Sequence, residues 1–267
     1  MIKELLRFKE PLLIMAEAAQ VWLEQLQQFS KLESKRAAEV FGQAIDLPAM
    51  TIDNGVAVIP IRGAVAQGVS GFEKLFGIVD MLDVSQELRD AQADASVKAI
   101  VLDIDSPGGT YNGTPELAAQ VAATTKPTFA FIGGCGASAA YMIASGADNI
   151  LATPSATVGQ VGTVAVYQSV ARRLEAEGVD VTVIASDTLK TAGHPLVEMT
   201  PEHFDFLKSR IAQATDVFRG FVADHRPAIA EADLHGQFYF GSEAAPRGFI
   251  DATAANLAEV TDFARQN

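Results

Sequence analysis

The stretch GGCGASAAYMIASGAD, residues Gly133–Asp148, decides the fold of this chain. It follows the apolar run TFAFIG, which is typical of a buried strand, and its glycines allow a tight bend before a helical pattern that begins near Ser138. A strand that turns directly into a helix is a building unit of an α/β domain. Ser138 is the hydroxyl residue at that turn, beside the free N–H groups and the positive end of the helix dipole. It is therefore either an N-cap or a nucleophile, and its small neighbours leave room for an extended substrate.

The rest of the chain repeats this alternation of strand and helix. Further short apolar runs rich in β-branched residues predict buried strands: VAVIPI, AIVLDID, NILATP and VDVTVIAS. Helical patterns lie between them at Asp80–Ala93, Thr114–Ala123 and Ser169–Glu177, and a long helix is predicted after Thr200 as N-cap and Pro201. We therefore expect an α/β domain with a mainly parallel sheet over residues 51–267.

Residues 1–50 are predicted to form a helical N-terminal arm. Apolar residues recur there at alternating three- and four-residue steps: Leu12, Met15, Ala19, Trp22, Leu26 and Phe29. This stripe must dock on another surface, either on the main domain or on a second copy of the chain. Pro48 ends the arm.

Composition excludes several classes of partner. The 267 residues carry a formal net charge of −13 and no basic run, so nucleic acid and anionic membranes are not expected as partners. The single cysteine, Cys135, cannot form an internal disulfide, and no cluster has metal-ligand spacing, so neither a metal nor another cofactor is expected. No apolar run is long enough for a membrane span, and we expect a cytoplasmic protein.

Two other junctions could carry chemistry. The strand AIVLDID runs into SPGG, where Gly108 and Gly109 let the backbone approach a ligand closely; the alternative is a simple turn. VDVTVIAS runs into a polar loop that contains Lys190. A lysine in a loop is ordinarily a solvated surface charge, which is the alternative to a functional role.

Taken together and in this order along the chain, the three junctions around Gly109, Ser138 and Lys190 resemble those of one protein family. Five segments are similar to segments of the signal peptide peptidase A-like serine-lysine peptidases, above all the phage prohead or capsid-assembly proteases. The five segments are DIDSPGG, GASAAYMIAS, ATPSATVGQVGTV, LKTAGHPLVEMTPE and GQFYFGSEAAPRGFID. The resemblance covers roughly residues 55–251. It implies a Clp-protease/crotonase-like fold and a serine endopeptidase that cleaves capsid or scaffold proteins in the host cytoplasm or prohead, or another protein or peptide.

The resemblance also implies residue roles. Ser138 matches the nucleophile and Lys190 the general base, while Gly109, supported by Gly108, and the N–H of Ala139 match the oxyanion hole. A lysine can act as a base only where burial lowers its pKa from about 10.4 toward neutrality. Many relatives carry a serine that orients the lysine where this chain has Gln160, and Thr163 is a candidate substitute. Family members form rings or domes, so we expect a homo-oligomer with an inactive monomer.

Four alternatives remain open at this stage. A Ser/His hydrolase would use His194, and a crotonase-type acyl-CoA enzyme would share the fold and its oxyanion amides. A non-catalytic capsid component of the same fold would need no dyad. The fourth alternative takes Cys135 as the nucleophile. Its ordinary role would be that of a small residue that packs in the bend.

Overall fold

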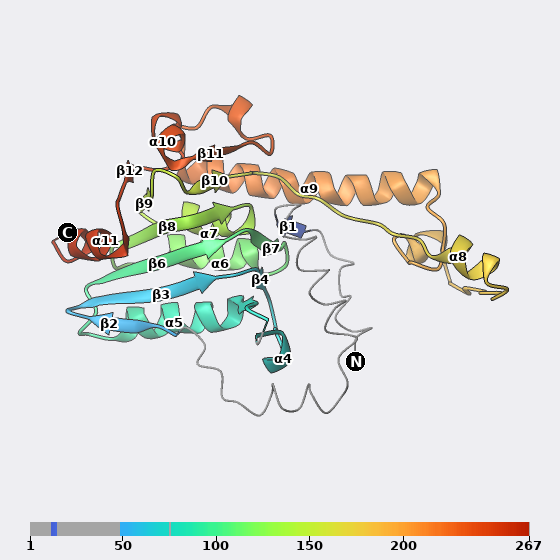
Figure 1. Ribbon diagram of the computed structural model, residues 1–267, viewed down its shortest axis with the longest axis horizontal. Coiled ribbons are helices and arrows are strands. Elements are labelled where there is room, and N and C mark those ends of the chain that lie inside the picture. Colours follow the sequence, from blue (N-terminus) through green and yellow to red (C-terminus); the bar gives the residue numbers. More distant parts are fainter. Residues whose placement is uncertain (1–11, 15–48, 75, 267) are drawn as a thin grey trace.

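The structure is a computed structural model that describes residues 12–14, 49–74 and 76–266 (Figure 1). Its strands are β1 (Leu12–Ile14), β2 (Thr51–Asp53), β3 (Val56–Arg62), β4 (Val65–Ala66), β5 (Val79–Asp80), β6 (Ala99–Ser106), β7 (Gly108–Thr110), β8 (Thr128–Ala137), β9 (Asn149–Ala152), β10 (Thr157–Gly159), β11 (Phe238–Phe240) and β12 (Ala252–Thr253). Its helices are α4 (Gly71–Lys74), α5 (Met81–Ala93), α6 (Thr114–Ala122), α7 (Ala139–Ser145), α8 (Ala171–Ala176), α9 (Pro201–His225), α10 (Gly241–Ala244) and α11 (Leu257–Ala264), with short 3-10 turns η1 (Thr188–Thr191), η2 (Glu231–Asp233) and η3 (Ala245–Arg247).

The main sheet has the order β11-β10-β8-β6-β3-β2. Off this path, β9 pairs with β8, and β12 pairs with β9. The pairs β3–β6, β6–β8, β8–β10 and β8–β9 are parallel, and the pairs β2–β3 and β10–β11 are antiparallel. The prediction of an α/β domain with a mainly parallel sheet is therefore confirmed.

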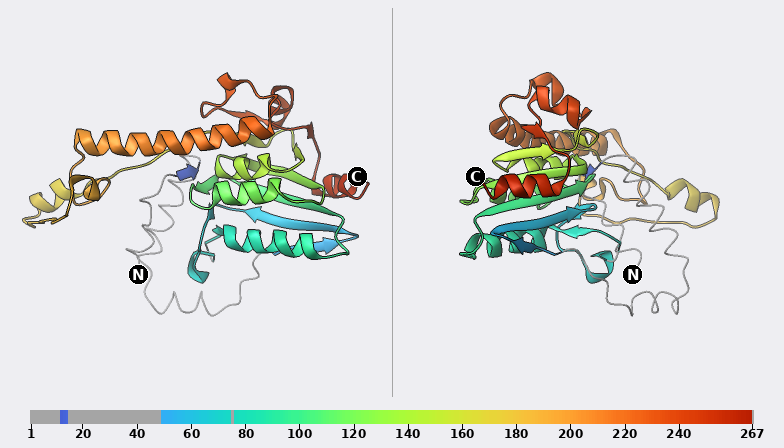
Figure 2. Two further views of the ribbon diagram at one scale, coloured as in Figure 1. Left: turned by 180° about the vertical axis from the view of Figure 1, so that it is seen from behind. Right: turned by 60° about the vertical axis from the view of Figure 1, so that its left-hand side comes forward.

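Helices cover both faces of this sheet, which explains why its strands read as continuous apolar runs (Figures 1 and 2). One face, with Ile100 and Ile132, belongs to the large core under α5, α6 and α7. The other face, with Val101 and Phe129, packs on Val260 of α11 in a smaller core. Every residue of α7 is buried, from Ala139 to Ser145.

A second, smaller sheet has the order β1-β7-β4-β5. Its strand β7 continues from the end of β6, so the glycine turn predicted at SPGG is a short strand in the structure. Leu12–Ile14, which we predicted to begin the helical stripe, form strand β1 instead. A strand forms here because β7 offers an open edge of backbone hydrogen-bonding groups to that segment. The remaining residues of the predicted stripe lie outside the described part of the chain, so the division at residue 50 stays a prediction.

Helix α9 leaves the body of the protein and carries a projecting arm, residues 164–200 (Figure 1). Thr200 is its N-cap and accepts from the N–H of His203, as the sequence indicated. The C-terminal half of α9 is buried through Ala214, Phe218 and Val222. Its N-terminal half reaches outward to the arm, which includes α8 and η1.

The prediction of a buried strand at VDVTVIAS is wrong for this chain. Residues 179–186 form no strand, and Ile184 is 93 % exposed. The segment lies in the projecting arm, where the described residues offer it no partner strand and no covering helix. Alternating β-branched residues favour a strand only when another strand satisfies their backbone.

Within the described residues, no helix combines the length and the apolar character needed to cross a bilayer.

Candidate active site

Ser138 sits where β8 ends and α7 begins, and its backbone is strained. Its φ is 56° and its ψ −122°, a conformation that residues other than glycine rarely adopt. The residue is 3 % exposed, and its side chain makes no capping hydrogen bond to the helix. An N-cap serine would have an extended backbone and would bond to the first turn. The N-cap interpretation therefore does not account for Ser138.

The strain is maintained by strand β10. The N–H of Ser138 donates to the carbonyl of Gly159 at 2.8 Å, and β10 runs parallel to β8 with Gly159 opposite Ala137. The next residue, Gln160, also has a positive φ of 54° and donates its N–H to the carbonyl of Gln237 at 2.7 Å. The segment after β10 is thus fixed directly beside the serine.

Two buried side-chain oxygens of this segment lack a partner. Among the described residues, nothing donates to Gln160 Oε1 or Thr163 Oγ1, although both atoms are buried. Leaving a buried polar group unsatisfied costs about 1–3 kcal/mol. Gln160 occupies the position of the lysine-orienting serine of many relatives, and Thr163 is the candidate substitute; both oxygens have free acceptor capacity.

The glycine strand β7 lies on the other side of the serine. Ser106, at the end of β6, pairs in register with Gly136, and α7 packs against β7. A Cβ on Gly109 would lie 1.7 Å from the carbonyl oxygen of Val65, so only glycine fits there. The predicted oxyanion residue is therefore positioned by close contact with β4. The first amides of α7, including that of Ala139, have no acceptor within their own helix.

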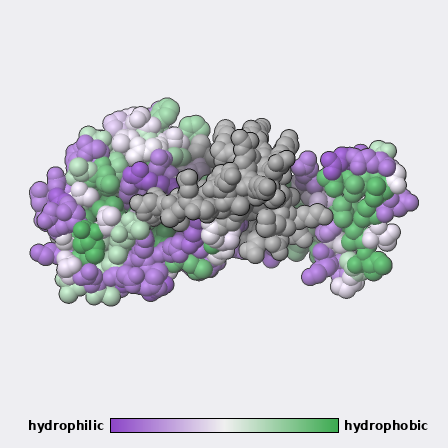
Figure 3. All heavy atoms as spheres, turned by 60° about the horizontal axis from the view of Figure 1, so that its bottom comes forward, coloured by the Kyte–Doolittle hydropathy of each residue, from purple (hydrophilic) through white to green (hydrophobic). Residues whose placement is uncertain are grey.

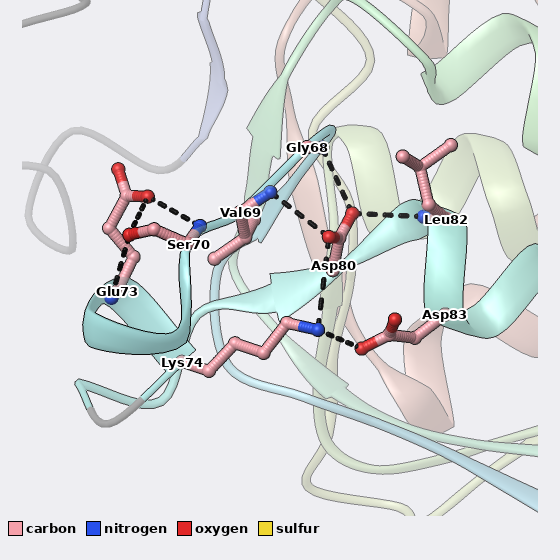
Figure 4. Close-up of polar contacts among 8 residues, drawn as sticks. All are labelled: Gly68, Val69, Ser70, Glu73, Lys74, Asp80, Leu82 and Asp83. Atoms are coloured by element: carbon pink, nitrogen blue, oxygen red, sulfur yellow. Dashed lines mark hydrogen bonds and ion pairs between the residues drawn. The ribbon is translucent and has the colours of Figure 1, made fainter.

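The loop beyond β4 is held against this sheet by Asp80 (Figure 4). Its buried carboxylate accepts the N–H groups of Gly68, Val69 and Leu82, each at 3.0 Å, and Lys74 Nζ lies 3.9 Å away. One side chain thus ties the chain after β4 to the first turn of α5. The sequence analysis missed this residue, because a single aspartate before a helix is an ordinary N-cap.

Lys190 does not meet Ser138 within one chain. It lies in η1 of the projecting arm and is exposed. His203 Nε2 lies 3.0 Å from the carbonyl oxygen of Thr188, which fixes η1 to the first turn of α9. About 22 Å of helix separates His203 from the buried Phe218 at 1.5 Å rise per residue. His203 is a second residue whose role the sequence did not indicate, since by position it lies merely in the first turn of the predicted long helix.

The surroundings of Cys135 do not support it as the nucleophile, and His194 shares the projecting arm with Lys190. His194 Nδ1 accepts from the N–H of Leu196 at 3.2 Å. Burial, together with the charge of Asp105, raises the pKa of the Cys135 thiol to about 11. A cysteine acts as a nucleophile in its thiolate form, which this environment disfavours.

The fold is of the Clp-protease/crotonase type, with a strained serine placed at the carboxyl end of a parallel sheet. In agreement, an enoyl-CoA hydratase from Shewanella pealeana superposes with a TM-score of 0.51 at 12 % identity, over 86 % of this chain and 78 % of that one. At this identity the likeness concerns the fold alone.

The sequence pattern of Peptidase family S49 matches residues 120–266, and the chain belongs to this family. The match includes Ser138, Gln160, Thr163 and Lys190, whereas Gly109 precedes it. Protease 4 of Salmonella typhi is 32 % identical over 88 % of this chain and 40 % of its own length. Capsid assembly protease C of Escherichia phage lambda is 27 % identical over 78 % of this chain and 48 % of its own length. The chain therefore spans less than half the length of these two curated relatives.

Proposed function

We propose that this chain is a serine endopeptidase with a Ser138/Lys190 dyad, and that its substrate is a protein or peptide bound in extended form. The observation that carries the proposal is the conformation of Ser138: a buried serine with positive φ and an uncapped side chain at a strand-to-helix turn. Strain of this kind costs about 1–3 kcal/mol and persists where the surrounding structure enforces it, typically at active sites. Membership of Peptidase family S49 supports the reaction class.

In the proposed reaction, Ser138 Oγ attacks the carbonyl carbon of the scissile peptide bond and transfers its proton to Lys190 Nζ. The N–H groups of Gly109 and Ala139 donate to the resulting oxyanion. The lysine then gives its proton to the leaving amine, and an acyl-enzyme forms. A water molecule, deprotonated by the same lysine, releases the acyl group and restores the serine hydroxyl.

The dyad forms between copies of the chain in this proposal. Lys190 is exposed on an arm, and Gln160 Oε1 and Thr163 Oγ1 are buried oxygens to which none of the described residues donates. Gln160 directly follows Gly159, whose carbonyl accepts the N–H of Ser138. In the proposed assembly, Lys190 Nζ of a neighbouring subunit donates to one of these two oxygens. The arm also exposes apolar surface, seen as green atoms on the right-hand lobe in Figure 3. Its exposed apolar residues are Val164, Val166, Val179, Val181, Val183, Ile184 and Leu189. Covering them in a homo-oligomer would contribute to the association.

The likeness to the phage lambda capsid assembly protease supports a capsid or scaffold protein as the substrate, with processing in a prohead within the host cytoplasm. The substrate class is proposed from that relative, and the role of Lys190 from the match to Peptidase family S49, whereas the role of Ser138 is proposed from its conformation.

A fluorophosphonate probe, which labels activated serines, tests the proposal between pH 6 and 10. We expect labelling of the wild type to rise with one ionisation and to be lost in Ser138→Ala and in Lys190→Ala. Lys208→Ala, an exposed lysine of α9, is the matched control and should label normally. Labelling that survives Lys190→Ala and disappears in His194→Ala would assign the base to His194. A folded, assembled protein that never labels would overturn the proposal in favour of a non-catalytic assembly role.

A further inference from the structure

Strand β1 occupies the outer edge of the glycine strand. It runs antiparallel to β7, with Leu12 opposite Thr110, Leu13 opposite Gly109 and Ile14 opposite Gly108. The inner edge of β7 is taken by β4, where Val65 pairs with Gly109. Leu12–Ile14 therefore cover the one edge of β7 that the body of the protein leaves open.

This edge belongs to a strand that contacts the helix beginning after Ser138. β7 follows β6, whose last residue, Ser106, pairs with Gly136, two positions before the serine. The helix that begins at Ser138 packs against β7. A peptide that adds to a sheet edge gains its affinity from main-chain hydrogen bonds, so β7 can accept a segment of this chain in place of a substrate.

The pairing is suited to displacement. Three residues form only a few hydrogen bonds, each with a net value of about 0.5–1.5 kcal/mol. Because the segment belongs to the same chain as β7, a substrate must displace an intramolecular competitor.

We infer that Leu12–Ile14 act as an internal competitor that occupies the peptide-binding edge of Gly108–Thr110 until a protein substrate replaces them. The inference rests on the proposed peptidase function, because the edge matters only where Ser138 is reactive. It adds a regulatory contact: the segment holds the resting chain in a substrate-like complex.

A disulfide tests the position of the segment without reference to activity. Leu12 and Thr110 are directly opposite in an antiparallel pair, and the Cα atoms of such pairs lie about 4.5–5.5 Å apart, within the range that a disulfide bridges. In a Cys135→Ser background, Leu12→Cys with Thr110→Cys should oxidise to an intramolecular disulfide within the full chain. Leu12→Cys with Thr253→Cys, on the exposed strand β12, is the control. Equal rates of cross-linking in the two pairs would overturn the inference.

Cleavage of unfolded casein tests the competition. We expect the oxidised Leu12→Cys/Thr110→Cys protein to cleave at least tenfold more slowly than its reduced form, with recovery after addition of dithiothreitol. The Leu13→Pro variant, which lacks the N–H, should lower KM severalfold at unchanged kcat, whereas Leu13→Ala, which keeps the N–H, should behave as the wild type. A locked protein that cleaves as fast as the reduced one would overturn the inference.

Failure of the proposed peptidase function and failure of the competitor inference give different experimental results. If the wild type never labels with fluorophosphonate, the peptidase function fails, and the competitor inference falls with it even where the cross-link forms. If the wild type labels and cleaves but the lock has no effect, the function stands and the inference alone fails.

Discussion

The N–H of Ser138 donates to the carbonyl oxygen of Gly159 at 2.8 Å, and this bond joins the start of α7 to the end of β10. Both residues have a positive φ, 56° at Ser138 and 103° at Gly159. The bond stabilises a serine conformation that local sequence preference opposes.

Replacing Ser138 by glycine should stabilise the protein relative to Ser138→Ala. Both variants lack the nucleophile, but only glycine adopts a φ of 56° without strain. We expect a difference of about 1 kcal/mol in the free energy of unfolding, or roughly 2–4 °C in Tm for a protein of this size. Thermal unfolding of the two variants side by side measures it, and an alanine variant as stable as the glycine variant would show that Ser138 is unstrained.

Gly109→Ala should abolish fluorophosphonate labelling. The new Cβ would lie 1.7 Å from the carbonyl oxygen of Val65, so β7 must move and withdraw its amide from the oxyanion. Loss of one such donor costs about 2.7–4 kcal/mol, a rate decrease of roughly 100- to 1000-fold. In the control Gly162→Ala, the nearest heavy atom to the new Cβ lies 3.9 Å away, and labelling should be retained. Normal labelling of Gly109→Ala would remove Gly109 from the site.

Mixing two inactive variants should restore activity if the dyad forms between subunits. Ser138→Ala supplies Lys190, and Lys190→Ala supplies Ser138. After dissociation and reassembly of a mixture in which the two chains differ in tag size, we expect fluorophosphonate on the Lys190→Ala chain alone. A mixture as inactive as its components would place both residues of a working dyad in one subunit.

Thr163→Val should lower fluorophosphonate labelling without lowering the stability of the protein. In one chain Thr163 Oγ1 is buried and has no partner among the described residues, so an isosteric apolar side chain should leave stability unchanged or raise it by about 1 kcal/mol. If the hydroxyl accepts from Lys190 in the assembled site, labelling should fall and its pH profile should shift. Chemical denaturation and the labelling profile together check this, and an unaltered profile would exclude the hydroxyl as a lysine partner.

Cys135 should react slowly with iodoacetamide at neutral pH. Burial raises the pKa of its thiol to about 11, so the rate should keep rising with pH toward that value, whereas the denatured chain should level off near 8.5. Because the thiol loses its proton earlier in the unfolded state, its contribution to stability should decline between about pH 8.5 and 11. A plateau near pH 8.5 in the folded protein would contradict the environment described for Cys135.

Much of the fold was predictable because its signals are local. Buried strands on a parallel sheet read as continuous apolar runs, and Thr200 with Pro201 marks the start of α9. VDVTVIAS carries the same local signal, yet it forms no strand, because strand formation needs a partner that the described chain does not supply there. Leu12 likewise fits a helical stripe by its spacing, but in the structure it pairs with Thr110.

The sequence by itself determined the class of the domain, the glycine-rich bend and the serine at the start of a helix, since these depend on residues adjacent in the chain. The tertiary structure alone decided that Ser138 is strained rather than capped, because the bond from Gly159 comes from another strand. It alone left Lys190 exposed on an arm and Gln160 Oε1 without a donor among the described residues. Contacts of this kind join segments distant in the sequence, and no local pattern encodes which of those segments meet.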